Sequence, residues 1–222
     1  MKKYYQAYED RYQTIHQKGF SWSSDKPTPI VLQTINKYQI LKEDNILEIG
    51  CGEGRDAKPL LNNSYSLLAT DISHEAIKYC QAQNPQYENH FAVLDCLGDT
   101  NNHKYKFIYA VAVIHMLVLD EDRKKFYSFI KEHLTDDGVA LICSMGDGQT
   151  EIKSDISKAF DLSKRDHFSG EVEVASTSCR MVSFEAFRKE INESDLTILE
   201  EGITSSLPDF NNLMFVVVKK HD

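Results

Sequence analysis

The chain has 222 residues, of which 41% are hydrophobic and 27% are charged, and these fractions are ordinary for a globular domain. Its net charge of −9 disfavours a general nucleic-acid binder, because such a protein needs a basic face to meet phosphates. Five cysteines without a C-x-x-C spacing argue against a disulfide framework and a metal cluster, and no secretory signal or membrane-spanning run is present. We therefore expect one cytoplasmic domain without a metal, as a monomer or homodimer.

The most informative segment is the apolar run 46–49, which ends in glycines at alternate positions, Gly50, Gly52 and Gly54. This pattern predicts a strand followed by a turn whose backbone approaches a ligand, because glycine accepts positive φ and has no Cβ. A helix that begins after the turn would offer free N–H groups to an anionic group. A dinucleotide fingerprint would place its third glycine where Arg55 stands, and the Gly-Lys-Ser/Thr of a P-loop is absent.

The second predicted strand, 67–71, ends on an acid, Asp71. A carboxylate at the end of this strand can accept hydrogen bonds from both hydroxyls of a ribose. The alternative is that Asp71 caps the following helix, but Ser73 is the better N-cap residue. We therefore expect Asp71 to be available for a ligand.

The third predicted strand, 90–94, also precedes an acid, Asp95. A helix over 75–83, ended by Pro85, separates it from the second strand. The alternative for Asp95 is an ordinary turn residue. Two successive strands that end on acids favour a ligand at the carboxyl edge of a parallel sheet.

The rest of the chain continues this alternation of strands and helices. The fourth predicted strand, 107–111, opens an apolar run, 107–119, that is too short for a membrane span and is interpreted as buried on both faces. The other expected elements are a helix over 122–133, a turn at 135–138, a strand at 139–145, a helix over 184–193 capped by Ser183, and strands at 196–203 and 213–219.

The pattern E-x-G-x-G-x-G from Glu48 to Gly54, with these strand ends, resembles the class I S-adenosylmethionine (SAM)-dependent methyltransferases of the small-molecule type. The resemblance covers roughly residues 40–220. It implies an α/β fold with a Rossmann-like, doubly wound, seven-stranded sheet, mostly parallel with a C-terminal antiparallel strand. It also implies SAM as the cofactor and methyl transfer to an acceptor.

The resemblance assigns residues of this chain to the cofactor. The implied SAM-binding residues are Glu48, Gly50, Cys51, Gly52 and Gly54 in the first motif, Asp71 and Ile72 after the second strand, Asp95 and Cys96 after the third, and Ala112 after the fourth. Asp95 would accept a hydrogen bond from the adenine amino group, and the N–H of Cys96 would meet a ring nitrogen. Cys51 is interpreted as a small turn residue and not as a nucleophile.

Residues 1–39 are predicted to form a helical, aromatic lid over the core at 40–145. Tyr12 and Trp22 are candidates for substrate and cofactor binding respectively, through cation–π contact with the sulfonium or its substrate. The alternative, that aromatic residues pack the helix onto the sheet, is favoured for Tyr5 and Tyr8.

Residues 146–181 are predicted to be an insertion that shapes the substrate pocket, ahead of a C-terminal helix and strands at 182–222. The alternation at 171–174 is typical of a hairpin strand. Asp147, His167 and Arg180 are its candidate pocket residues.

His115, just past the fourth strand, is the candidate catalytic residue, as a general base if the acceptor must lose a proton. It could instead orient the substrate or cofactor, or be a core histidine. No Asn/Asp-Pro-Pro-Tyr motif or nucleophilic cysteine stands at 110–113, which disfavours amino methylation of adenine or glutamine and cytosine-C5 methylation. A small-molecule acceptor remains, and a non-catalytic SAM-binding regulatory module and a nucleotide- or NAD-dependent enzyme are the alternatives.

Overall fold

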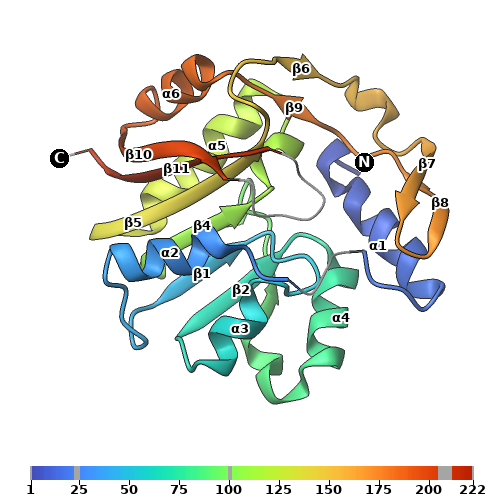
Figure 1. Cartoon of the computed structure of the whole chain (residues 1–222), viewed down its shortest axis with the longest axis horizontal. Helices are drawn as coiled ribbons and strands as arrows, with labels where there is room; N and C mark the ends of the chain where they lie inside the picture. The colour runs from blue at the N-terminus through green and yellow to red at the C-terminus, as the bar shows by residue number, and fades with distance from the viewer. Residues whose placement is uncertain (1, 23–25, 100–101, 205–211, 222) are drawn as a thin grey trace.

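In the computed structural model, which describes residues 2–22, 26–99, 102–204 and 212–221, the core is one twisted sheet with helices on both faces (Figure 1). The strand order is β10-β11-β5-β4-β1-β2-β3. The strands are β1 (Ile46–Ile49), β2 (Leu67–Asp71), β3 (Phe91–Val93), β4 (Tyr105–Val111), β5 (Leu134–Met145), β10 (Leu196–Thr204) and β11 (Leu213–Lys220). Strands β1 to β5 pair in parallel, whereas β11 is antiparallel to both β5 and β10. The predicted doubly wound sheet with a C-terminal antiparallel strand is confirmed.

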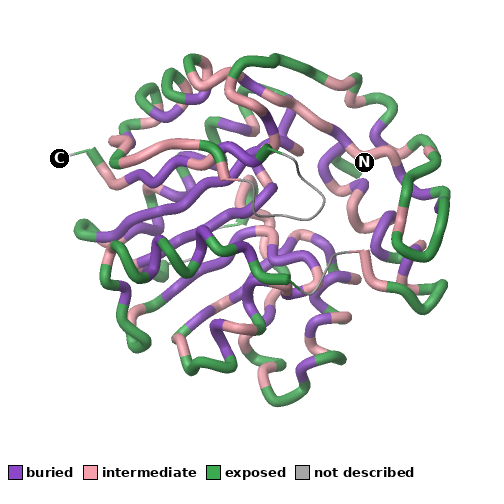
Figure 2. The backbone as a smooth tube through the Cα atoms, in the orientation of Figure 1, coloured by how far each residue is buried: buried purple, intermediate pink, exposed green. Residues whose placement is uncertain are grey.

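Successive side chains along each strand point to opposite faces of the sheet, so the interior consists of two hydrophobic cores, one on each face. In β1, Ile46 packs toward the helices α2 (Pro29–Lys37), α3 (Ala57–Asn62) and α4 (His74–Gln83), whereas Leu47 packs toward α5 (Asp120–His133) and α6 (Phe184–Asn192). Neither side chain is exposed, so each contributes roughly 1.5–3 kcal/mol by burial. The buried backbone in Figure 2 follows the strands accordingly.

Two segments outside the sheet lie side by side. A 3-10 turn, η1 (Tyr4–Gln6), leads into α1 (Ala7–Gln17), which packs against α4 and against β8 (Gly170–Ala175). Strand β8 forms an antiparallel hairpin with β7 (Leu162–His167), and Figure 1 shows α1 beside it. The predicted hairpin strand at 171–174 is therefore confirmed. The remaining short elements are β6 (Ile152–Lys153), paired with β9 (Arg180–Met181), and the 3-10 turns η2 (Pro85–His90), η3 (Ile114–Met116) and η4 (Ile156–Lys158).

Within the apolar run 107–119, β4 ends at Val111 as predicted, and Ala112 then turns the chain with φ +58° into η3. The later apolar residues of this run are buried under α5 and not within the sheet. The segment 135–138 is not a separate turn but an irregularity within β5, where the pairing with β4 shifts between Tyr105 and Phe107.

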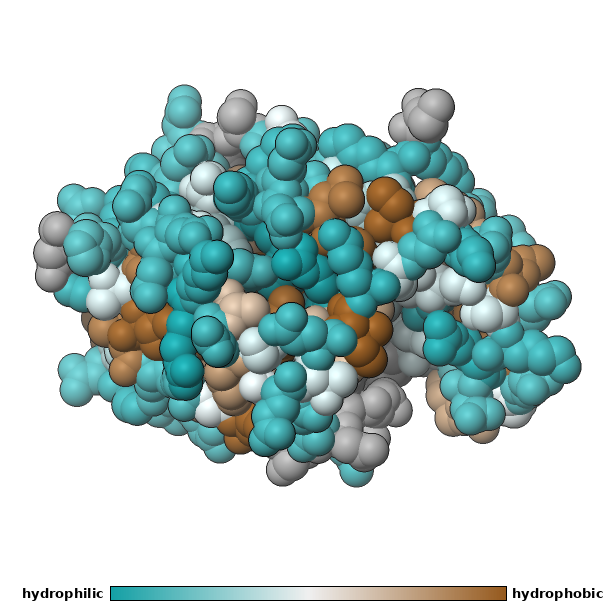
Figure 3. Space-filling view, turned by 90° about the horizontal axis from the view of Figure 1, so that it is seen from above, coloured by the Kyte–Doolittle hydropathy of each residue, from teal (hydrophilic) through white to brown (hydrophobic). Residues whose placement is uncertain are grey.

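The helix caps agree with the sequence. The Ser73 hydroxyl accepts a hydrogen bond from Ala76 N (3.0 Å), and the Ser183 hydroxyl accepts one from Ala186 N (3.2 Å). The face shown in Figure 3 is mostly hydrophilic, with small separate hydrophobic patches. In the described ranges no helix combines the length and the apolar character that crossing a bilayer requires.

Candidate active site

The turn after β1 is built on three glycines in the left-handed region. Gly50, Gly52 and Gly54 have φ of +73°, +54° and +81°. A Cβ on Gly50 would lie 2.4 Å from Cγ2 of Val113, and one on Gly52 would lie 2.7 Å from the Tyr12 hydroxyl. The first two glycines are therefore required both by backbone conformation and by the close approach of neighbouring segments.

Replacing Gly50 with alanine is expected to destabilise the protein by about 2–4 kcal/mol, from left-handed strain plus the overlap with Val113. Gly19→Ala is the matched control, because Gly19 has φ +76° and nothing within 4 Å of the added Cβ. It should cost only about 1–2 kcal/mol. Urea denaturation measures both, and equal losses would contradict the steric argument.

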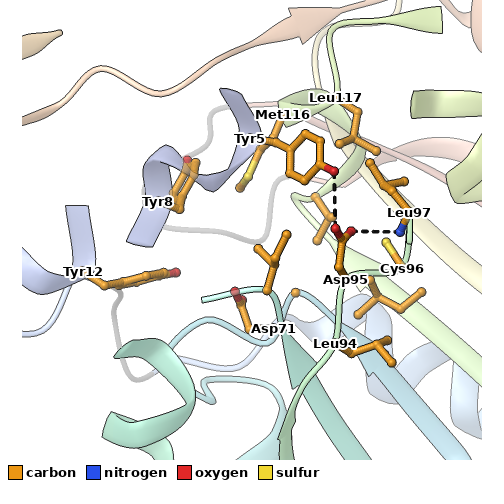
Figure 4. A pocket seen from close by; sticks show the side chains of 14 residues that line it. Tyr5, Tyr8, Tyr12, Asp71, Leu94, Asp95, Cys96, Leu97, Met116 and Leu117 are labelled. Carbon is orange, nitrogen blue, oxygen red and sulfur yellow. Dashed lines mark hydrogen bonds between the residues drawn. The ribbon is translucent and has the colours of Figure 1, made fainter. Parts of the chain in front are cut away.

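A narrow cavity of about 80 Å³ opens beside this turn, at the carboxyl ends of β1, β2 and β3. Asp71 and Asp95 both lie on its wall, and Tyr5, Tyr8 and Tyr12 of the N-terminal segment close it from the opposite side (Figure 4). The other lining residues are Ile49, Gly50, Ile72, Leu94, Cys96, Leu97, Val113, Met116 and Leu117. The cavity is thus apolar with two carboxylates.

Asp71 joins the glycine turn to the start of α4. Its Oδ2 accepts a hydrogen bond from Gly52 N and its Oδ1 one from Ser73 N, both at 2.8 Å. The cap at Ser73 had suggested that Asp71 would have no partner in the chain, but both of its oxygens are hydrogen-bonded. Each oxygen still retains a further lone pair for a ligand. Burial raises the pKa of Asp71 to about 6, against the opposing effect of these backbone donors.

Asp95 is held by the loop that follows β3 and by the N-terminal segment. Its Oδ1 accepts a hydrogen bond from Leu97 N (3.0 Å), while Oδ2 accepts long ones from Tyr5 Oη (3.4 Å) and Lys3 Nζ (3.3 Å). Hydrogen bonds of this length are weak, so a ligand donor could replace them. The contacts of Oδ1 and Tyr5 are drawn in Figure 4.

A wide cavity of about 990 Å³ adjoins the narrow one and shares Tyr8, Tyr12, Gly50 and Met116 with it. It lies between the glycine turn, α1 and the hairpin β7–β8. Its wall contains the predicted site residues Glu48, Gly50, Cys51, Gly52, Ala112, His115, Tyr12, Trp22 and His167. Residues brought there from the insertion include Lys158, Arg165 and Ser178.

The polar groups behind the turn are shielded from water. Glu48 is buried, and burial together with nearby Asp56 raises its pKa well above the ordinary value, which favours the protonated carboxyl. Asp56 accepts hydrogen bonds from N and Oγ1 of Thr28. A hydrogen bond with the neighbouring Cys80, together with burial, raises the pKa of the Cys51 thiol, and a protonated thiol is a poor nucleophile.

His115 is buried at the end of the wide cavity, in η3. Burial lowers the pKa of His115 to about 4, and the guanidinium of Arg123 lowers it further. Arg123 donates to the carbonyls of Ile114 (2.8 Å) and Leu117 (3.4 Å), which flank the histidine, and pairs with Glu190 (2.6 Å). The imidazole is therefore neutral near pH 7 and held in a fixed loop.

A pH titration distinguishes the two titratable groups of the site. As the pH falls through about 6, Asp71 takes up a proton and loses acceptor capacity, whereas His115 stays neutral down to about pH 4. The affinity for S-adenosylhomocysteine, the demethylated cofactor, should fall about tenfold between pH 7 and 5. The fall should persist in His115→Gln and disappear in Asp71→Asn; loss of the pH dependence in His115→Gln would contradict the assignment.

Three predicted residues are not on either cavity wall. Gly54 packs against Cys80 and Phe91, so it shapes the turn from behind. Asp147 accepts hydrogen bonds from the backbone of Gln149 and Thr150 within its own loop. Arg180 binds Asp120 and the carbonyl of Val118, and does not reach the pocket.

Sequence reasoning missed several wall residues. Tyr5 and Tyr8, expected to pack the helix onto the sheet, both line the narrow cavity. Arg11 and Arg165 line the wide one, from segments more than 150 residues apart. The closely spaced aromatic residues of the N-terminal segment could have indicated that the tyrosines line a cavity. Nothing in the sequence near either arginine indicates that it does.

Comparison with known proteins agrees with this geometry. Residues 47–140 match the profile of a family described as a methyltransferase domain. The part of the chain that carries the glycine turn, Asp71 and Asp95 is therefore similar to a methyltransferase domain. A search of curated proteins gives no match for this chain.

Solved structures match the fold of this chain over nearly its whole length. The CcbJ methyltransferase from Streptomyces caelestis is 13% identical, with a TM-score of 0.71 over 97% of this chain and 98% of that one. A SAM-dependent methyltransferase from Clostridium acetobutylicum is 15% identical, with a TM-score of 0.67 over 95% and 96%. The glycopeptide N-methyltransferase MtfA, solved with SAM, is 13% identical, with a TM-score of 0.64 over 90% and 96%. At these identities the likeness shows the shared fold.

Proposed function

We propose that this chain is a methyltransferase that binds SAM across the two cavities and methylates a small molecule held in the wide one. The observation that carries the proposal is the pair of strand-end carboxylates, Asp71 and Asp95, on an apolar cavity that adjoins the glycine turn. They are the two acids that the family resemblance assigns to the ribose and to the adenine.

The residues of the narrow cavity fit the adenosine half of the cofactor. Asp71 would accept from the ribose hydroxyls and Asp95 from the adenine amino group, in place of its weak contacts with Lys3 and Tyr5. The N–H of Cys96 donates to none of the described residues, so it can meet a ring nitrogen. The apolar walls that would enclose the flat base are Ile72, Leu94, Leu97, Val113, Met116 and Leu117.

The glycine turn, Glu48 and Ala112 fit the methionine half. When bound, SAM supplies a methyl carbon that its sulfonium makes electrophilic. Tyr12 lines both cavities and presents an aromatic ring, which attracts a cation, whereas the Trp22 ring on the wall of the wide cavity already has the Arg11 guanidinium 4.7 Å from its centroid. The helix α1 is tied down beside them, because His16 bridges Glu53 (2.8 Å) and Glu75 (3.1 Å). The N-terminal segment thus acts as a lid that excludes water from the site.

His115 orients the acceptor in this proposal and is not a strong base. An imidazole with a pKa near 4 is poorly matched to removing a proton from an amine or a hydroxyl at neutral pH. A neutral ring nitrogen still accepts a hydrogen bond from the acceptor's N–H or O–H and fixes its direction. Alignment of the two reactants accounts for most of the catalysis that methyl transfer needs.

The wide cavity favours a small-molecule acceptor. It is walled by α1 and the hairpin β7–β8, and the chain's net charge of −9 opposes approach of a polyanion. The five cysteines are free thiols, the state typical of a reducing compartment, so we place the enzyme in the cytoplasm. A monomer or homodimer remains our prediction for the assembly.

Transfer of a labelled methyl group tests the function. The protein is incubated with methyl-labelled SAM and a cell extract freed of protein and nucleic acid by filtration. We expect label in a new small molecule, together with formation of S-adenosylhomocysteine. If the protein binds S-adenosylhomocysteine but transfers no label to this extract, to nucleic acid or to protein, the chain is a SAM-binding module without catalysis.

A further inference from the structure

Arg11 is a buried cation on the wall of the wide cavity. Only 4% of the residue is exposed, and its guanidinium lies 4.7 Å from the ring centroids of both Tyr8 and Trp22. Its Nε and Nη2 donate to the carbonyls of Ala175 (3.1 and 2.6 Å) and Ser176 (2.9 Å). These contacts hold the guanidinium between α1 and the hairpin.

The charge of Arg11 is not matched by a carboxylate. Among the described residues no aspartate or glutamate pairs with it, and its Nη1 takes part in none of the hydrogen bonds there. Burial lowers the pKa of Arg11, against the opposing effect of Tyr8, and nearby Arg165 lowers it further by repulsion. A buried charge that is paired only with carbonyl dipoles is costly, and an anion would relieve that cost.

Three further cations stand on the same wall, whereas most acids there are already engaged. Arg55 pairs with Asp56 (3.2 Å), but neither Lys158 nor Arg165 forms an ion pair with a described residue. The acids with partners are Glu53, bound by His16 and Trp22 N; Asp56, bound by Thr28 and Arg55; and Asp155, bound by Ser157. Asp166 lies exposed at the rim, and Glu48 lies behind the glycine turn.

We propose that the acceptor carries a carboxylate, which binds Arg11 with Arg165 and Lys158 at the rim of the wide cavity. A carboxylate brings one negative charge to the buried guanidinium of Arg11, and the rings of Tyr8 and Trp22 offer apolar surface to the rest of the molecule. This inference rests on the proposed function, because it names the class of acceptor for that site.

The anchoring of Arg11 separates this subsite from the cofactor. The guanidinium is fastened to residues 175–177 of the insertion, with Thr177 Oγ1 at 3.0 Å as well. The glycine turn instead contacts Tyr12, the next residue on α1. Adjacent residues of a helix point in different directions, so Arg11 serves the hairpin side of the cavity and Tyr12 the turn side.

Fluorescence of Trp22 reports on this subsite, because Trp22 is the only tryptophan of the chain and stacks on Arg11. The full-length protein, saturated with S-adenosylhomocysteine, is titrated with benzoate and with benzamide at constant ionic strength. We expect a saturable change with benzoate at concentrations at least tenfold below those needed for benzamide. Equal responses, or no response to benzoate, would overturn the proposal.

Variants separate ion pairing from structure. Arg11→Gln should abolish the preference for benzoate, and the double variant Lys158→Gln/Arg165→Gln, which removes no structural tie of α1, should weaken benzoate binding several-fold. Lys189→Gln on α6 is the control and should change nothing. Affinity for S-adenosylhomocysteine should stay within about twofold in every variant.

The cofactor titration keeps the two proposals apart. A tenfold or greater loss of S-adenosylhomocysteine affinity in Arg11→Gln would assign the arginine to the cofactor's own carboxylate and overturn the inference. Normal S-adenosylhomocysteine binding without any response to benzoate overturns the inference alone. Failure of the wild-type protein to bind S-adenosylhomocysteine overturns the proposed function, and the inference with it.

Discussion

Replacing Asp71 with asparagine is expected to lower the affinity for S-adenosylhomocysteine about 100-fold. The carboxylate would accept two ribose hydroxyls, and hydrogen bonds to a charged group contribute about 1.5–3 kcal/mol each. It also accepts from Gly52 N and Ser73 N, so the amide of asparagine would place a donor against one of these donors. The variant should therefore lose both the contact with the ligand and the hydrogen bond that fixes the conformation of the glycine turn.

Asp147→Asn is the matched control for this variant. Asp147 also accepts from two backbone N–H groups, at 2.9 and 2.7 Å, but its loop lies outside both cavities. It should bind S-adenosylhomocysteine as the wild type does. Calorimetric titration compares the two variants, and a normal affinity in Asp71→Asn would remove Asp71 from the ribose site.

Replacing Arg123 with methionine is expected to reduce the free energy of unfolding by about 3–5 kcal/mol. Only 1% of Arg123 is exposed, and it pairs with Glu190 while it donates to carbonyls of the loop after β4. The variant leaves Glu190 with the more distant Arg180 (3.6 Å) and with Tyr127 Oη (3.0 Å). A loss of this size is a large part of the stability of a typical domain.

Two further variants define the origin of that loss. Arg188→Met removes an exposed arginine paired with Glu201 and should cost less than about 1 kcal/mol. The double variant Arg123→Met/Glu190→Leu should regain part of the loss, because it no longer leaves an acid without its main partner. Urea denaturation measures all three, and a loss below 1 kcal/mol in Arg123→Met would show that this buried pair does not hold the loop.

The strands and the cofactor edge could be predicted because their signals are local. Strands β1 and β2 have the predicted limits, since the glycines after Ile49 and the acid Asp71 mark the ends of apolar runs. The caps at Ser73 and Ser183 are likewise set by short-range hydrogen bonds. The residues that form each of these signals lie within a few positions of one another, so the sequence alone shows them.

The walls of the wide cavity could not be predicted in the same way. Arg11 reaches the site only because α1 packs on a hairpin more than 150 residues later in the chain. The turn after β4 was not predicted, because Ala112 has a positive φ, a conformation that alanine does not signal. Asp147 was placed in the pocket from its position after β5, although its own loop supplies both of its backbone partners.

Calorimetric titration of the purified protein with S-adenosylhomocysteine, with NAD as the control, tests the central claim most directly. We predict micromolar binding of S-adenosylhomocysteine and none of NAD, because Arg55 stands where a dinucleotide site needs its third glycine. Binding of NAD, or no binding of S-adenosylhomocysteine, would contradict the assignment of the glycine turn, Asp71 and Asp95 to SAM.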